Sequence, residues 1–92
     1  MYESHTQVAT ANAERLTKRL CNHWRHKFPV EIDSNGAEIK LPIGVCGLHT
    51  VDGGLAVKLQ ATEEEQLPRM QTVVADHLQR MAGEEALTFD WS

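Results

Sequence analysis

Apolar residues recur every three or four positions in two segments of the chain, which is the spacing of one face of a helix. In the first segment these residues are Ala13, Leu16, Leu20 and Trp24. Asn12 precedes them and is a residue type that caps helices, while Pro29 drives the residue before it away from helical geometry. The pattern therefore predicts a helix over residues 13–26.

In the second segment the apolar residues are Leu67, Met70, Val74, Leu78 and Met81. Thr62 and Glu65 have the spacing of a capping box, and Gly83 is a typical C-terminal stop. Pro68 falls inside this pattern and predicts a kink or a restart, because proline lacks the N–H that an interior turn needs. We expect a helix from Thr62 to about Ala82.

Apolar and polar residues alternate elsewhere, which is the period of a half-buried strand. The alternating segments are residues 5–11, 30–32, 37–41, 45–51, 55–61 and 87–91. Asn35 and Gly36 can supply the positive φ of a tight hairpin. The order β-α-β-β-β-β-α-β predicts an α+β two-layer sandwich, with two helices on one face of an antiparallel sheet. This order resembles the TATA-box-binding-protein-like fold.

The chain has 92 residues and a hydrophobic fraction of 41%, which suffices for one domain spanning residues 1–92. No apolar run approaches the roughly 20 residues that a membrane-spanning helix needs. The first residues lack the cationic and apolar segments of an export signal. We therefore expect a cytoplasmic protein, with no membrane partner, in which Cys21 and Cys46 stay reduced.

Charge is distributed unevenly along the chain, whose formal net charge is −4. Residues 12–28 hold five cations and one anion, whereas the rest of the chain holds four cations and twelve anions. The overall sign disfavours nucleic acid as a partner. The basic residues on the outer side of the first helix are Arg15, Lys18, Arg19 and His26. This face is either solvated or docks on an acidic partner or on the second helix.

A metal site is one interpretation of the histidines and cysteines. Cys21 and His23 cannot share an ion on a helix, because residues two apart point to nearly opposite sides. His23 and His26 are locally compatible, and His77 or Cys46 would have to supply a third ligand. The alternative is a pair of solvated histidines, and no cofactor is predicted.

A second interpretation is a ligand site between the two helices. His77 falls within the apolar stripe of the second helix, and His23 lies beside the first stripe, with Lys27 one turn further on. Two core histidines that bond to their neighbours would satisfy the same pattern. Alternatively, a polar pocket lined by His23, Lys27, His77 and Arg80 receives a small anion such as a carboxylate or a catecholate. The secondary candidates are Cys21, His26 and Cys46.

Catalysis is not predicted. Cys46 shares the inward direction of Leu48, where a thiol is inert, and neither cysteine has a base at a suitable spacing. The glycine-containing turns lack the phosphate-loop motif. We interpret the chain as non-enzymatic.

These residues resemble a bacterial family of unknown function, domain-of-unknown-function family 2218. The resemblance rests on AERLTKRLCNHWRHKFPVE (13–31), GVCGL (44–48), VVADHLQRM (73–81) and EEALTFDW (84–91). Asn22 and Met81 depart from the family pattern, which has lysine and an aromatic residue there, and this weakens a purely electrostatic role for that corner. The association of family members with iron–siderophore uptake and reduction genes implies an accessory role.

Together these features predict a non-enzymatic module that binds a small ligand or a protein partner and is accessory to iron or siderophore handling. Two alternatives stay open. One is a metal-binding protein that uses His23, His26 and a distant histidine or cysteine. The other is a homodimer that pairs through a sheet edge or the open sheet face. An apolar patch on that face, from Val45, Val51 and Ala56, would favour the dimer.

Overall fold

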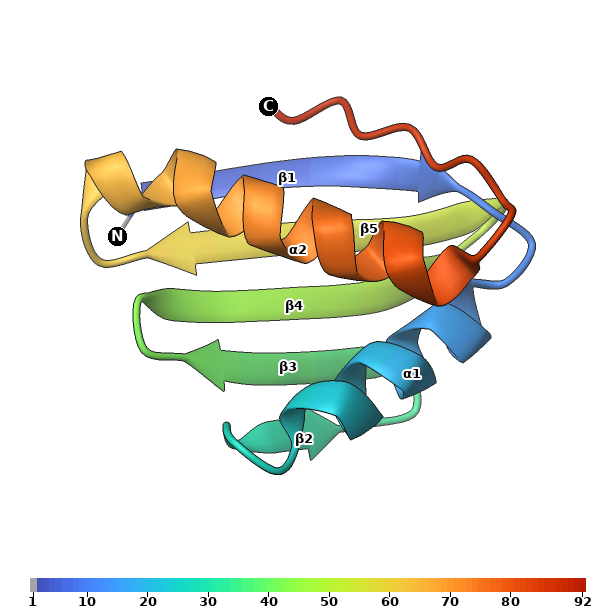
Figure 1. Cartoon of the computed structure of the whole chain (residues 1–92), viewed down its shortest axis with the longest axis horizontal. Helices are drawn as coiled ribbons and strands as arrows, with labels where there is room; N and C mark the ends of the chain where they lie inside the picture. The colour runs from blue at the N-terminus through green and yellow to red at the C-terminus, as the bar shows by residue number, and fades with distance from the viewer. Residues whose placement is uncertain (1) are drawn as a thin grey trace.

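The computed structural model describes residues 2–92 and has the α+β architecture that the sequence predicts (Figure 1). In chain order the elements are β1 (Tyr2–Ala9), α1 (Ala13–Trp24), β2 (Val30–Ile32), β3 (Gly36–Leu41), β4 (Gly44–Val51), β5 (Gly54–Ala61), the 3-10 helix η1 (Glu64–Gln66) and α2 (Leu67–Ala82). β1 begins and ends earlier than predicted, and α1 ends earlier than predicted. No helix within the described residues is long and apolar enough to cross a bilayer.

The strands form one antiparallel sheet in the order β1-β5-β4-β3-β2. Both helices cover the same face, with α1 over β3 and β4 and α2 over β5 and β1 (Figure 1). The helices also touch each other and run in opposite directions. Within residues 2–92, the other face of the sheet carries no helix.

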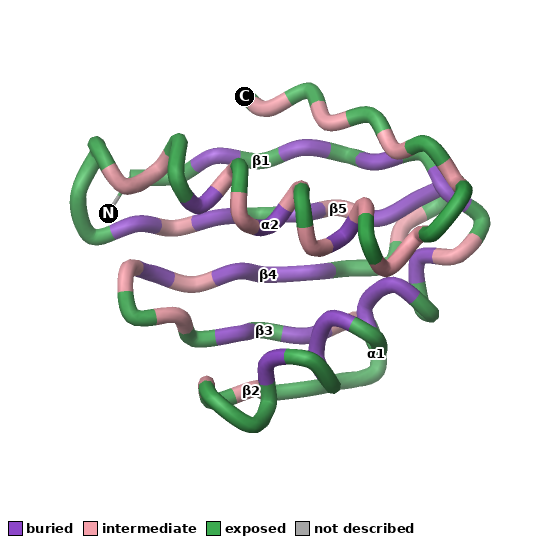
Figure 2. Tube along the Cα trace, in the orientation of Figure 1, coloured by how far each residue is buried: buried purple, intermediate pink, exposed green. Residues whose placement is uncertain are grey.

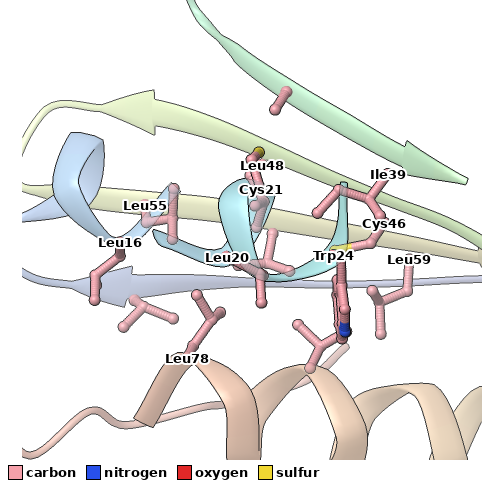
Figure 3. Packing of buried hydrophobic residues seen from close by; sticks show 14 of the residues in the cluster. Leu16, Leu20, Cys21, Trp24, Ile39, Cys46, Leu48, Leu55, Leu59 and Leu78 are labelled. Atoms are coloured by element: carbon pink, nitrogen blue, oxygen red, sulfur yellow. The ribbon is translucent and has the colours of Figure 1, made fainter. Parts of the chain in front are cut away.

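Alternation along the strands directs one set of side chains into the layer between the sheet and the helices. In β5 all the predicted inward residues are buried: Leu55, Val57, Leu59 and Ala61. The tube in Figure 2 shows this alternation along the strands and the buried stripe of each helix. Figure 3 shows Leu20 and Leu78 from the two helices in the same layer as Leu59 from the sheet. Burial of each such leucine stabilises the folded protein by about 2 kcal/mol, and this layer holds the helices on the sheet.

The start of α2 differs from the prediction. The α-helix begins at Leu67, after η1. Within the described chain, no side chain forms a capping hydrogen bond at the start of η1 or of α2. The capping box predicted for Thr62 and Glu65 is therefore wrong. Pro68 lies in the first turn of α2, where a missing N–H costs little because first-turn N–H groups have no partner within the helix. The predicted restart is confirmed.

The hairpin between β2 and β3 also differs from the prediction. Neither Asn35 nor Gly36 has a positive φ. The carboxylate of Asp33 instead accepts hydrogen bonds from the backbone N–H groups of these two residues, at 2.8 and 2.9 Å. Glycine is needed at position 36 for close approach, because a Cβ there would lie 1.8 Å from the carbonyl oxygen of Leu48.

The C-terminal segment is the largest departure from the expected fold. Residues 87–91 do not form the predicted closing strand, and this segment runs beside β1 without regular structure (Figure 1). Its end is held by backbone hydrogen bonds between His5 and Ser92, at 3.2 and 2.9 Å. The half-buried apolar residues are Leu87, Phe89 and Trp91. The sequence alternation therefore correctly predicts which side chains face the core, but not a strand.

Candidate anion-binding cleft

The structure brings His23 of α1 and His77 of α2 together at one end of the helix pair. Their ring centroids are 5.2 Å apart and their planes are inclined by 51°. Trp24 completes the cluster, because its ring centroid lies 4.9 Å from that of His77. These rings meet because the helices run antiparallel, which places the last turn of α1 against the middle of α2.

The ring of His77 has a defined orientation. Its Nδ1 lies 2.7 Å from the carbonyl oxygen of Val73, one turn earlier in α2. A carbonyl oxygen can only accept, so Nδ1 carries a proton and donates it to this bond. In the neutral ring Nε2 is then an acceptor. His77 is half-buried, so part of this residue is open to solvent.

The predicted site residues differ in their surroundings. His23 and Lys27 are exposed, so the interpretation as two core histidines is wrong for His23, whereas His77 is half-buried and bonds the carbonyl oxygen of Val73 as that interpretation expects. His23, Lys27 and His77 line one cleft. Arg80 is exposed and does not line this cleft, whereas Arg69, which the sequence reasoning missed, does.

The position of Arg69 follows from the directions of the helices. Along α1, the step from His23 to Lys27 leads toward the C-terminal end of the helix. Since α2 runs the opposite way, the matching steps from His77 lead back toward Arg69 and away from Arg80. Residues 69, 73 and 77 are four apart and share a face, a signal that becomes readable once the antiparallel arrangement is known.

The cleft has a volume of about 470 Å³ and opens between α1, α2 and the β3–β4 turn. This size is within the range of small-molecule sites. Its apolar lining consists of Trp24, Phe28, Leu41, Pro42, Ile43, Met70 and Val73. Its polar lining consists of His23, Lys27, Arg69 and His77.

No acidic residue of the described chain lines this cleft, although Asp and Glu outnumber Lys and Arg by 13 to 9 in the sequence. Within residues 2–92, neither Lys27 nor Arg69 forms an ion pair. The cleft is therefore a locally cationic site on an acidic protein. Such a site attracts anions and disfavours cations.

The two cysteines lie in the core and do not line the cleft. Both Cys21 and Cys46 are free thiols and are buried. Burial raises the pKa of Cys46 to about 12, and the neighbouring Cys21 adds to this effect. Burial also raises the pKa of Cys21, which the charge of Arg25 partly offsets. Both groups are protonated at neutral pH, and a protonated thiol is a poor nucleophile and a poor metal ligand.

The described residues 2–92 contain no group of three or more His, Cys, Asp or Glu side chains placed to hold one metal ion. His23 and Cys21 point apart, as helix geometry predicts, since His23 is exposed and Cys21 is buried. His26 is exposed and does not line the cleft. The arrangement therefore does not support the alternative that joins His23 and His26 to a distant ligand.

The open face of the sheet is mixed rather than apolar. Val45, Val51 and Ala56, which were predicted to contribute to an apolar patch, are half-buried. Ion pairs lie on the same face, between Lys58 and Glu3 at 3.6 Å and between Lys40 and Glu31 at 3.7 Å. Charged groups therefore stand among the aliphatic residues that were predicted to form an apolar patch. Pairing of two copies stays a prediction, which light scattering can test.

The outer face of α1 contacts the second helix through one of its basic residues. The Nη1 group of Arg19 donates a hydrogen bond of 2.6 Å to the carbonyl oxygen of Met81 at the end of α2. A cation is favourable there because helix C-terminal carbonyls carry partial negative charge. The other basic residues of this face, Arg15, Lys18 and His26, are exposed.

Comparison with known proteins agrees with the fold. The NMR structure of PA4090 from Pseudomonas aeruginosa is similar, with a TM-score of 0.83 and 40% sequence identity over 100% of this chain and 96% of that chain. No curated protein matches the chain. A family model described as an uncharacterised protein conserved in bacteria matches residues 5–92. The chain belongs to this family, DUF2218.

Proposed function

We propose that the protein is a non-enzymatic binding module that holds a small organic anion in the cleft between α1 and α2. One observation carries the proposal: the cleft has two unpaired cations and two imidazoles in its lining and no acidic residue of the described chain. In this function Lys27 and Arg69 bind the anionic group, because hydrogen bonds between charged partners are about twice as strong as neutral ones.

The imidazoles add hydrogen-bonding groups to the two cations of the site. Because Nδ1 of His77 is bonded to Val73, Nε2 is the ring nitrogen left for a ligand. A hydroxyl of the ligand would donate to this nitrogen in the neutral ring, whereas the protonated ring would donate to the anion. His23 lies at the surface beside it and closes one side of the site. These roles need no bond to be made or broken, which fits a binding module.

A more specific form of this proposal makes the protein an accessory of iron or siderophore handling. A catecholate-type acid would suit the cleft, since it combines an anionic group with an aromatic ring that can pack on Trp24. We therefore include 2,3-dihydroxybenzoate among the ligands to be tested, beside benzoate.

The test is a titration of the 15N-labelled protein followed by NMR. Benzoate and 2,3-dihydroxybenzoate should shift the backbone amide signals of His23, Lys27 and His77, and should leave those of the open sheet face in place. The double variant Lys27→Gln/Arg69→Gln should weaken binding at least tenfold.

The matched control is Arg15→Gln/Lys18→Gln, which removes the same charge from an exposed part of α1 outside the cleft. Loss of binding in both double variants would show a general charge effect and would contradict the site. Absence of any saturable shift in the unmodified protein would contradict the proposed function itself.

A further inference from the structure

We infer that the anion bound in the cleft is an amphiphile, with one acidic head and an apolar body that enters the cleft first. This inference rests on the proposed function and adds the chemical class of the ligand. It comes from the depth at which each kind of lining residue lies.

The lining residues are sorted by depth. Trp24 and Met70 are 5% and 0% exposed. Phe28, Ile43 and Val73 are half-buried around them. The two cations, Lys27 and Arg69, are exposed, as are His23 and Pro42. The cleft is therefore apolar at its floor and cationic at its rim, and a ligand that matches it must change polarity along its own length.

The floor offers aromatic as well as aliphatic surface. The rings of Trp24 and Phe28 meet edge to face, with centroids 6.2 Å apart and planes inclined by 74°. The ring centroid of His77 also lies 4.9 Å from that of Trp24. Rings fixed in this way present a rigid apolar surface at a low cost in side-chain entropy. An alkyl chain or an aryl ring would pack on the exposed edge of Trp24 and would remove the half-buried side chains of Phe28, Ile43 and Val73 from water.

Other ligand classes fit this arrangement less well. A compact polyanion, such as phosphate or citrate, would have to lose hydration against the apolar floor or remain at the rim, where it gains little from the cleft. An uncharged apolar molecule would leave Lys27 and Arg69 without a partner. A cation would meet two like charges. A molecule with an anionic head and an apolar body matches both parts of the cleft.

The experiment measures the dissociation constants of acetate, butanoate, hexanoate and octanoate by calorimetry or NMR. If the body enters the cleft, each added methylene should lower the dissociation constant about three- to fourfold, until the cleft is filled. A series in which affinity does not depend on chain length would overturn the inference. So would citrate or phosphate binding as tightly as octanoate.

Two variants separate the head from the body. Lys27→Gln/Arg69→Gln should weaken every member of the series by a similar factor and keep the dependence on chain length. Val73→Thr replaces a methyl group by a hydroxyl at nearly constant volume, so it should weaken octanoate about threefold or more and leave acetate unchanged. The matched control is Val45→Thr, a half-buried valine on the open sheet face, which should change neither.

The outcomes distinguish this inference from the proposed function. If no carboxylate of any length binds, both are wrong. If acetate, citrate and phosphate bind in the cleft as tightly as octanoate does, the proposed anion site is supported and the inference of an amphiphilic ligand is contradicted. If hexanol binds as tightly as hexanoate and Lys27→Gln/Arg69→Gln has no effect, the cleft is an apolar site and the acidic head is contradicted.

Discussion

The two ends of the α1–α2 seam differ in what their polar side chains contact. Where α1 begins and α2 ends, polar side chains bind the backbone of the neighbouring segments. Arg19 donates to the carbonyl oxygen of Met81 at 2.6 Å. The amide of Gln79 donates to the carbonyl oxygen of Glu85 at 2.7 Å and accepts from the N–H of Leu87 at 3.0 Å. This end is closed by its own chain.

At the other end, Lys27 and Arg69 have no ion-pair partner within the described residues, and the seam opens into the cleft. The comparison suggests a division of roles along one helix pair. Polar groups that bind the chain contribute to stability, whereas polar groups left to the solvent are available to a ligand. Substitutions at the closed end should therefore change stability more than those at the open rim.

The largest effect is expected at Trp24, a large residue that serves both the core and the cleft. Its side chain is 5% exposed and packs against His77 and Phe28. Trp24→Ala should lower the free energy of unfolding by about 3–5 kcal/mol and should also abolish ligand binding. Urea denaturation measures the first effect. A loss below about 1 kcal/mol would show that this ring is a surface feature of the cleft rather than part of the core.

The second effect is a loss of stability at high pH, which comes from the buried thiol of Cys46. The pKa of Cys46 is raised to about 12 by burial, above an ordinary value near 9. The protonated thiol of Cys46 is favoured in the folded protein. The stabilisation that this gives is therefore fully present below about pH 9 and is lost as the pH rises from about 9 toward about 12. The free energy of unfolding should fall there by up to about 1.4 kcal/mol per pH unit from this group.

The variant Cys46→Ala isolates this contribution, because lysine and tyrosine titrations are common to both proteins. The difference in stability between the two proteins should narrow as the pH rises above 9. A constant difference up to pH 11 would show that solvent reaches this thiol in the folded protein.

The third effect tests the closed end. Gln79→Ala removes both hydrogen bonds to the C-terminal segment, so stability should fall by about 1–2 kcal/mol. Hydrogen exchange should accelerate at the amide of Leu87, and exchange at His77 should stay unchanged. Gln79→Glu keeps the acceptor for Leu87 and loses the donor, and it should give an intermediate result. Equal exchange rates at the amide of Leu87 in the unmodified protein and both variants would contradict the role of Gln79 in holding the C-terminal segment.

The smallest effect on stability is expected at the open rim. Lys27→Gln/Arg69→Gln replaces exposed cations that have no ion-pair partner within residues 2–92, so the unfolding free energy should change by less than about 0.5 kcal/mol. The same variant should lose ligand binding. A destabilisation above about 1 kcal/mol would mean that these cations stabilise the fold, which would remove the contrast between the two ends.

Much of this fold could be predicted because its signals are local. The alternation in β5 identifies which residues face the core, and the apolar spacing in α1 identifies the stripe that covers the sheet. Both signals depend only on how the backbone turns from one residue to the next. The C-terminal segment shows the limit of this reasoning, because its alternation predicts burial while strand formation also needs hydrogen-bonding partners along β1.

The candidate site could be predicted only in part for the same reason. The sequence placed histidines beside two apolar stripes, and the structure brings His23 and His77 together. The sequence could not show which arginine joins these histidines, since that depends on the opposite directions of α1 and α2. The sequence by itself determined the layers and the core. Only the tertiary structure decided that Arg69 rather than Arg80 lies at the cleft, because residue spacing describes one helix and the packing of two helices sets their relative direction.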